Sequence, residues 1–212
     1  MAMIKSALEL ALEKTKDMKV DPVALEASET KQDGKRTAGQ YLEDPDSVDI
    51  EKKLAACPKD KRVHLKAGMH EILSSQLQLP TGEAGLEKLE KIAAAYVALS
   101  AGAGLLGGAV GGAIAEKKIQ GLFQQLAAFL KQYLDDMKNV EQVIKKQWAP
   151  KLREKERQMA ARLGQDVRLD PMMDPEFSAF YKQNVGALRQ QYQAALDKAK
   201  QDLAGMIGLP QE

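Results

Sequence analysis

The chain has 212 residues, of which 29% are charged and 5% aromatic, and its formal net charge is +1. This length can bury a core without disulfides, and the near-zero charge excludes a strong global attraction to nucleic acid or to an anionic membrane. The single cysteine, Cys57, excludes an intramolecular disulfide and fits a cytoplasmic protein. Abundant Ala, Leu, Glu, Lys and Gln predict an all-α fold.

The first region, residues 1–79, is expected to contain short helices. Apolar residues recur at helical spacing over 4–18, which predicts a first helix there. Asp21-Pro22 predicts an N-cap and the first turn of a second helix that extends toward Tyr41. Asp46 or Ser47 can cap a short third helix. A basic helix follows Pro58, and the break LPTGEAG ends the region.

The second region, residues 80–118, contains the uncharged stretch AYVALSAGAGLLGGAVGGAIA with six glycines. Each glycine costs up to about 1 kcal/mol in a soluble helix, so close packing must compensate if the stretch is helical. On a helical wheel the small residues form one face, which lets two backbones approach closely. We therefore predict a Gly/Ala-rich central helix that self-associates, in the manner of a glycine zipper, through Ser100, Gly104, Gly107, Gly108, Gly111 and Gly112.

The same stretch leaves two alternatives open. Residues 92–115 carry no charge, and as a helix they would extend about 36 Å, enough for a hydrocarbon core of about 30 Å. Their hydrophobicity is marginal, lysines flank both ends, and no aromatic belt marks both ends. The alternatives are membrane insertion of 92–115 and a flexible hinge.

The third region, residues 119–212, carries two apolar seams with steps of three or four residues, a coiled-coil-like pattern. The first is Ile119, Leu122, Leu126, Phe129, Tyr133, Met137, Val140 and Ile144; the second is Phe177, Tyr181, Val185, Leu188, Tyr192, Ala195, Ala199, Leu203 and Met206. They predict a long antiparallel helical hairpin in an elongated protein. Pro150 is expected to break the first helix, a short charged helix to end at Gly164, and Asp174-Pro175 to begin the last helix.

Enzyme chemistry finds little support in the sequence. His64 and His70 are six residues apart and point to different helix faces, and Cys57 has no identifiable base. No P-loop or GxSxG motif occurs, and the glycine-rich stretch lacks the preceding strand and the lysine that phosphate-binding loops require. We therefore predict no catalytic residue, metal site, cofactor or small-molecule substrate.

A basic segment, residues 145–168, has a local net charge of +5 and contains the single tryptophan. Phosphates of RNA or lipid could contact Lys145, Lys146, Trp148, Lys151, Arg153, Lys155 and Arg157. The interpretation we prefer is a solvated helix of mixed charge in which Trp148 closes the end of the hairpin core.

Three passages, SALELALEKT, GKRTAGQYLEDP and QWAPKLREKERQMAARLGQDVRLDPMMDPEFSAF, together resemble an uncharacterised bacterial all-helical family, a domain of unknown function. The resemblance implies a bacterial cytoplasmic helical protein and brings no activity, cofactor or site residue.

These observations favour a non-enzymatic structural or interaction protein that forms a homo-oligomer in the cytoplasm. The first alternative is an inner-membrane associated protein that inserts residues 92–115. The second is RNA or ribosome binding through residues 145–168.

Overall fold

The computed structural model describes residues 21–101, 104–166 and 168–210, and all regular structure in these ranges is helical, which confirms the all-α class. The α-helices are α2 (Pro22–Glu43), α3 (Ile50–Ala56), α4 (Arg62–Gln76), α5 (Lys88–Ala101), α6 (Gly104–Leu163) and α7 (Pro175–Met206). Short 3-10 helices cover Pro45–Ser47, Glu83–Gly85 and Pro171–Met173. The helix expected over 4–18 lies outside the described residues.

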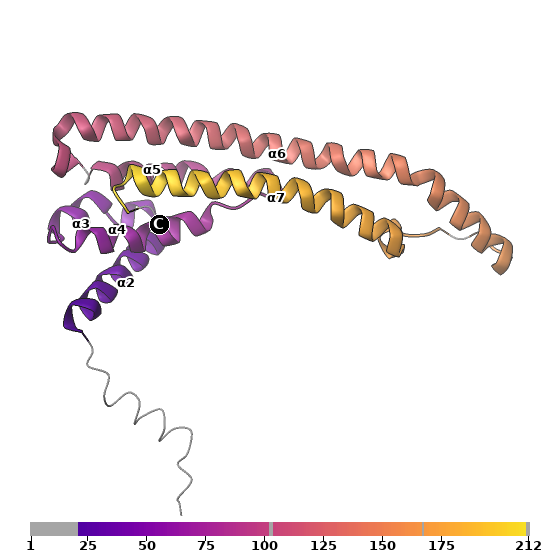
Figure 1. Cartoon of the computed structure of the whole chain (residues 1–212), viewed down its shortest axis with the longest axis horizontal. Coiled ribbons are helices and arrows are strands. Elements are labelled where there is room, and N and C mark those ends of the chain that lie inside the picture. Colours follow the sequence, from indigo (N-terminus) through magenta and orange to yellow (C-terminus); the bar gives the residue numbers. More distant parts are fainter. Residues whose placement is uncertain (1–20, 102–103, 167, 211–212) are drawn as a thin grey trace, which may run out of the picture.

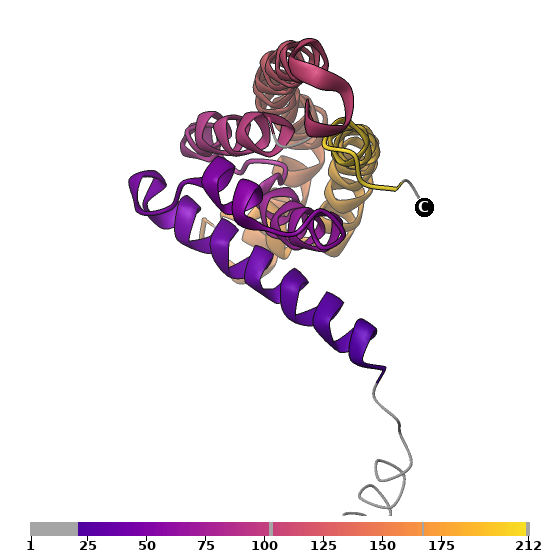
Figure 2. The ribbon, with the colours of Figure 1, turned by 90° about the vertical axis from the view of Figure 1, so that its left-hand side faces the viewer.

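The molecule is elongated along α6 (Figure 1). Helices α2 to α5 gather against the first half of α6 and the last half of α7, at what we call the packed end (Figure 2). The rest of α6 and α7, residues 137–163 and 175–188, extends past them as a pair that we call the arm. The largest core cluster spans the sequence from Ala38 to Ile207, so the packed end needs both halves of the chain.

At the packed end α2 and α4 cross through two glycines. A Cβ on Gly34 would overlap the carbonyl oxygen of Leu65, and a Cβ on Gly68 would overlap that of Lys31. Both glycines are buried inside helices. Glycine is required here because the two backbones touch, and the packing offsets its poor helix propensity.

Helix α5 packs against α6, and the two run in opposite directions (Figure 1). The rings of Tyr96 and Phe123 lie 5.8 Å apart, and Leu99 and Ile119 are buried in the same core cluster. The expectation of one central helix is therefore wrong, since the uncharged stretch is divided between α5, which ends at Ala101, and α6, which begins at Gly104. The apolar residues on either side of the division bury one another, which a single continuous helix would not allow.

Helices α6 and α7 contact each other along their length in antiparallel order. The Tyr133 and Tyr192 rings lie 5.1 Å apart, while further along α6 the Trp148 and Phe177 rings lie 5.9 Å apart. Most residues of the two seams are buried or half-buried. The prediction is wrong at one position of the second seam: Ala195 is exposed, and the next residue, Leu196, is buried.

The expected helix break at Pro150 is wrong, because α6 continues through it to Leu163. Proline removes one backbone hydrogen bond and bends a helix. Buried side chains on both sides of it, Trp148 and Leu152, belong to one cluster with α7 and hold the helix together across this position. Figure 1 shows α6 bending toward this end.

Aspartates cap the first turns of three α-helices, α2, α3 and α7. Asp21 and Asp174 accept backbone N–H groups at the starts of α2 and α7, as expected. Helix α3 is capped by Asp49, whose Oδ1 accepts the N–H of Lys52 at 3.0 Å. Neither Asp46 nor Ser47, the expected caps, lies at that position, because both belong to the 3-10 turn before it.

A buried hydrogen bond joins α4 to the residue that follows α7. Gly208 adopts φ 82°, and the N–H of Leu209 returns to the carbonyl of Ala204 at 3.0 Å. Buried Lys66 donates from Nζ to the carbonyl oxygen of Ile207 at 3.0 Å. Burial lowers the pKa of Lys66, and the nearby Arg62 adds to the effect. The ammonium group therefore satisfies one of the free carbonyls that every helix C-terminus leaves.

Candidate functional site

The far end of the arm is where α6 stops and the chain returns to α7. Gly164 takes φ 69°, a conformation that favours glycine, and its N–H donates to the carbonyl of Ala160 at 2.9 Å. The expected helix end at Gly164 is correct, although the helix that ends there is α6 itself. After the 3-10 turn Pro171–Met173, Asp174 accepts the N–H groups of Glu176 at 2.9 Å and Phe177 at 3.1 Å.

Lys155 ties α6 to the first turn of α7. Its Nζ donates to Asp174 Oδ2 at 2.6 Å and to Glu176 Oε2 at 3.0 Å. The hydrogen bond from Lys155, together with the N–H of Phe177, lowers the pKa of Asp174, and the two carboxylates raise the pKa of Lys155. This contact fixes the distance between the two helices at the arm's end.

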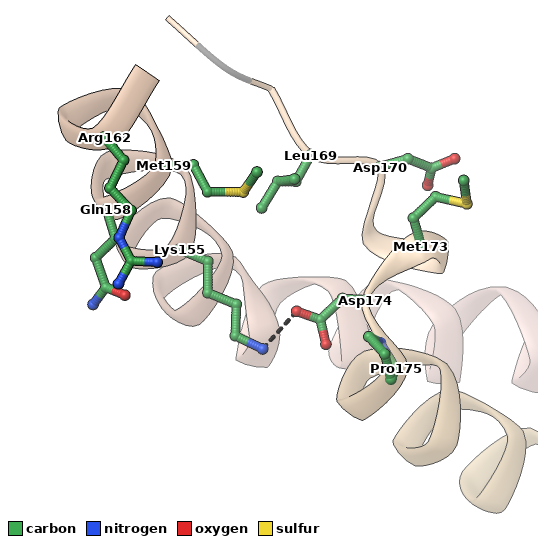
Figure 3. A pocket seen from close by; sticks show the side chains of 9 residues that line it. All are labelled: Lys155, Gln158, Met159, Arg162, Leu169, Asp170, Met173, Asp174 and Pro175. Atoms are coloured by element: carbon green, nitrogen blue, oxygen red, sulfur yellow. Dashed lines mark hydrogen bonds and ion pairs between the residues drawn. The ribbon is translucent and has the colours of Figure 1, made fainter. Parts of the chain in front are cut away.

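A cavity of about 270 Å³ lies between the last turns of α6 and the returning segment. Its lining residues are Lys155, Gln158, Met159, Arg162, Leu169, Asp170, Met173, Asp174 and Pro175. In Figure 3 the side chains of Met159 and Leu169 point toward each other, and the Lys155–Asp174 pair lies beneath them. The cavity therefore has an apolar centre and a charged margin.

Large apolar side chains are exposed at this end of the arm: Met159 and Met173 line the cavity, and Leu163 and Met172 adjoin the lining residues Arg162 and Met173 in the chain. Their exposed fractions are 38% for Met159, 58% for Leu163, 48% for Met172 and 81% for Met173. Single exposed apolar residues are ordinary, but several within a helix end and the segment that follows it are typical of a contact surface. We call Met159, Leu163, Leu169, Met172 and Met173 with the cavity the tip surface.

Two charged residues at the margin form no ion pair with any described residue. Arg162 and Asp170 lie on opposite sides of the cavity (Figure 3). Asp170 accepts the N–H of Met172 at 2.9 Å, which leaves its second carboxylate oxygen without a donor among the described groups. The tip surface thus offers one cation and one anion to a partner.

The basic segment predicted from the sequence is partly turned inward. Trp148 is 8% exposed and stacks on Phe180 with ring centroids 5.2 Å apart, as the preferred interpretation expects. Lys151 lies over the tryptophan ring at 4.3 Å, and Lys155 is paired with α7. The remaining candidates are exposed along α6: Lys145, Lys146, Arg153 and Arg157.

The residues predicted for self-association lie on two helices. Ser100 belongs to α5, is 1% exposed and donates to the carbonyl of Val97 at 2.7 Å. The glycines at 104, 107, 108, 111 and 112 belong to the first turns of α6, and the side-chain surroundings of 101–111 lie outside the described part. Ser100 therefore does not continue their face. Among the helices of the described ranges, none reaches the length and apolarity that a membrane crossing requires.

The reactive side chains at the packed end, His70 and Cys57, are partly buried. His70 Nδ1 lies 2.8 Å from the hydroxyl of Tyr96, and burial lowers the pKa of His70, with a smaller effect of Lys200. Burial raises the pKa of the Cys57 thiol, which disfavours the nucleophilic thiolate. Within the described ranges no group of three or more His, Cys, Asp or Glu residues could hold a metal ion.

Reasoning from the sequence did not identify the tip surface. The signal was the apolar pair Met172-Met173 between two aspartates, in a segment expected to be a connection. Met159 and Leu163 were expected in the short charged helix that ends at Gly164. Their neighbours in that helix are mostly charged or polar, so the sequence did not indicate an apolar surface there. The cavity forms only when the returning segment meets α6, which local sequence does not reveal.

A family model matches residues 51–205, most of the chain, and its description is that of a family of unknown function. The match includes the third of the passages that carry the resemblance, 147–180, and the tip surface within it, while the first two passages precede it. No curated protein and no solved structure matches the chain.

Proposed function

The chain belongs to the family of unknown function DUF6657, and we propose that it acts as a non-enzymatic interaction protein whose arm carries a binding surface at its end. The observation that supports this proposal is the tip surface, where two exposed methionines line a cavity of about 270 Å³ and two more exposed apolar side chains adjoin lining residues in the chain. Exposing these groups to water is unfavourable, and a protein partner would remove them from it.

The position of the tip surface also supports a binding role. The arm holds it away from the packed end (Figure 1), so that a partner can approach without contacting α2 to α5. Three of the exposed side chains are methionines, which adapt their shape to an apolar partner. The Lys155 bridge to Asp174 and Glu176 holds the surface in place.

Protein contact is favoured over RNA binding by the environment of the basic segment. Trp148 is unavailable for base stacking because it is packed against Phe177 and Phe180. RNA binding through the remaining cations predicts lower affinity when Lys151, Arg153 and Arg157 are each replaced by glutamine. Unchanged affinity for RNA in that variant would remove this alternative.

Site-specific crosslinking in the cells that produce the protein tests the proposed function. A photoreactive amino acid replaces Met172, which is 48% exposed in the tip surface, or Val23, which is 74% exposed on α2 as the matched control. We expect crosslinked products of defined mass from position 172 and few from position 23. Absence of products at 172 would contradict a binding role for the tip surface.

A further inference from the structure

We propose that the tip surface binds the tip surface of a second copy of this chain, forming a two-fold symmetric dimer. The inference rests on the proposed function and names the partner of the same site. In such a dimer the same residues serve on both sides, so the surface must be complementary to itself. The tip surface meets this requirement in shape and in charge.

The shape requirement is met by a protruding side chain beside a hollow. Met173 is 81% exposed, the largest exposed fraction among the large apolar residues described. The adjoining cavity of about 270 Å³ has Met159 and Leu169 at its apolar centre. An apolar cavity of about 150 Å³ can hold a benzene molecule, so this one is large enough for a methionine side chain. Met173 of each copy enters the cavity of the other.

The charge requirement is met by Arg162 and Asp170. They have opposite signs, lie on opposite sides of the cavity and form no ion pair within the described part of their own chain (Figure 3). A two-fold axis between Met173 and the cavity brings Arg162 of one copy toward Asp170 of the other, twice per dimer. A second copy therefore pairs both of these charges.

The arrangement of the molecule allows this contact. The arm ends project from the packed ends (Figure 1), so two copies can meet end to end without collision between their larger parts. The net charge of +1 produces little repulsion between copies. Because the tip surface is small, we expect a transient dimer with a dissociation constant in the micromolar range.

Sedimentation velocity over a concentration series of the full chain tests the proposal. We expect a monomer–dimer equilibrium in the native chain. Met173→Ala is expected to weaken it at least tenfold, which corresponds to about 1.4 kcal/mol. Val23→Ala, the matched control at another exposed apolar residue, is expected to leave it unchanged.

A double-mutant cycle tests the charge pair. Arg162→Gln removes the cation, and Asp170→Asn removes the anion while keeping an oxygen that can accept the N–H of Met172. Each is expected to weaken the dimer about threefold. The double variant is also expected to weaken it about threefold, because the second change removes a group whose partner is already gone.

The outcomes separate the two proposals. A native chain that stays monomeric, or a dimer that Met173→Ala does not weaken, overturns the second-copy inference. Independent losses that multiply to about ninefold in the double variant overturn the charge pairing. Crosslinks from position 172 to a different protein, with a monomeric native chain, retain the proposed function and reject the second copy. No crosslinks at 172 and no dimer reject both.

Discussion

The packed end and the arm bury their apolar side chains in different ways. At the packed end, six helices contribute to one core, two backbones touch at Gly34 and Gly68, and even a lysine is enclosed. In the arm, only two helices cover each other, and the aromatic cluster of Trp148, Phe177 and Phe180 provides much of the contact. Two helices alone cannot enclose their own ends, and the apolar residues left uncovered form the tip surface.

The largest effect is expected in the arm, from Trp148→Ala. Loss of this buried ring leaves a cavity beside Phe177 and Phe180 and is expected to cost about 3–5 kcal/mol. Denaturant unfolding followed by circular dichroism measures the cost, and hydrogen exchange locates it. Faster exchange in residues 137–163 with unchanged protection of α4 would sharpen the division between arm and packed end. Uniformly faster exchange would contradict it.

A smaller loss is expected at the packed end from Gly68→Ala. The new Cβ overlaps the backbone of α2 at Lys31 and lies 3.0 Å from the nitrogen of Lys35, so α2 must move. We expect destabilisation of about 2 kcal/mol, measured by thermal and chemical unfolding. The control is Gly39→Ala on α2, where the new Cβ meets nothing within 4 Å. It should gain up to about 1 kcal/mol in helix propensity, and equal stabilities of the two variants would contradict the close crossing.

Acidification is expected to weaken the packed end through His70. Burial lowers the pKa of His70 below its usual 6.5, so between that lowered value and pH 6.5 the unfolded chain binds more protons. The free energy of unfolding therefore falls as the pH drops through this window. His70→Gln is expected to flatten this dependence, whereas His64→Gln, at the exposed histidine, is expected to preserve it. Equal pH profiles for the two variants would count against the prediction.

The smallest effect on stability is expected from Gly108→Leu in the first turns of α6. If the glycines also contact a second copy, the bulky side chain separates the backbones there and leaves the tip surface intact. Light scattering is then expected to show a lower average molar mass than the native chain at the same concentration, with helix content retained. An unchanged molar mass would contradict self-association through the glycines.

Much of the fold follows from local sequence. Asp21-Pro22 and Asp174-Pro175 mark helix starts because side chain and ring geometry both favour them, and the structure has helices at both positions. The seams of α6 and α7 follow from helical periodicity. These features need no knowledge of distant residues.

The rest depended on contacts between distant segments. Pro150 does not end α6, since packing of Trp148 and Leu152 against α7 outweighs the lost hydrogen bond. Gly34 seemed to weaken a helix, yet it is buried where α4 passes, thirty or more residues later in the chain. The tip surface is likewise formed by residues from both sides of a chain reversal, so no local pattern indicates it.

The hydrogen bond from Lys66 to the carbonyl of Ile207 can form only after the end of α7 has been synthesised. Leu196, Leu203 and Ile207, which are among the last buried residues of this core in chain order, are fully buried in the core shared with α2 to α5. A nascent chain therefore cannot complete this core until the end of α7 has left the ribosome. Until that moment the apolar faces of α4 and α5 lack part of their cover, and a chain truncated before α7 ends would retain that exposed surface.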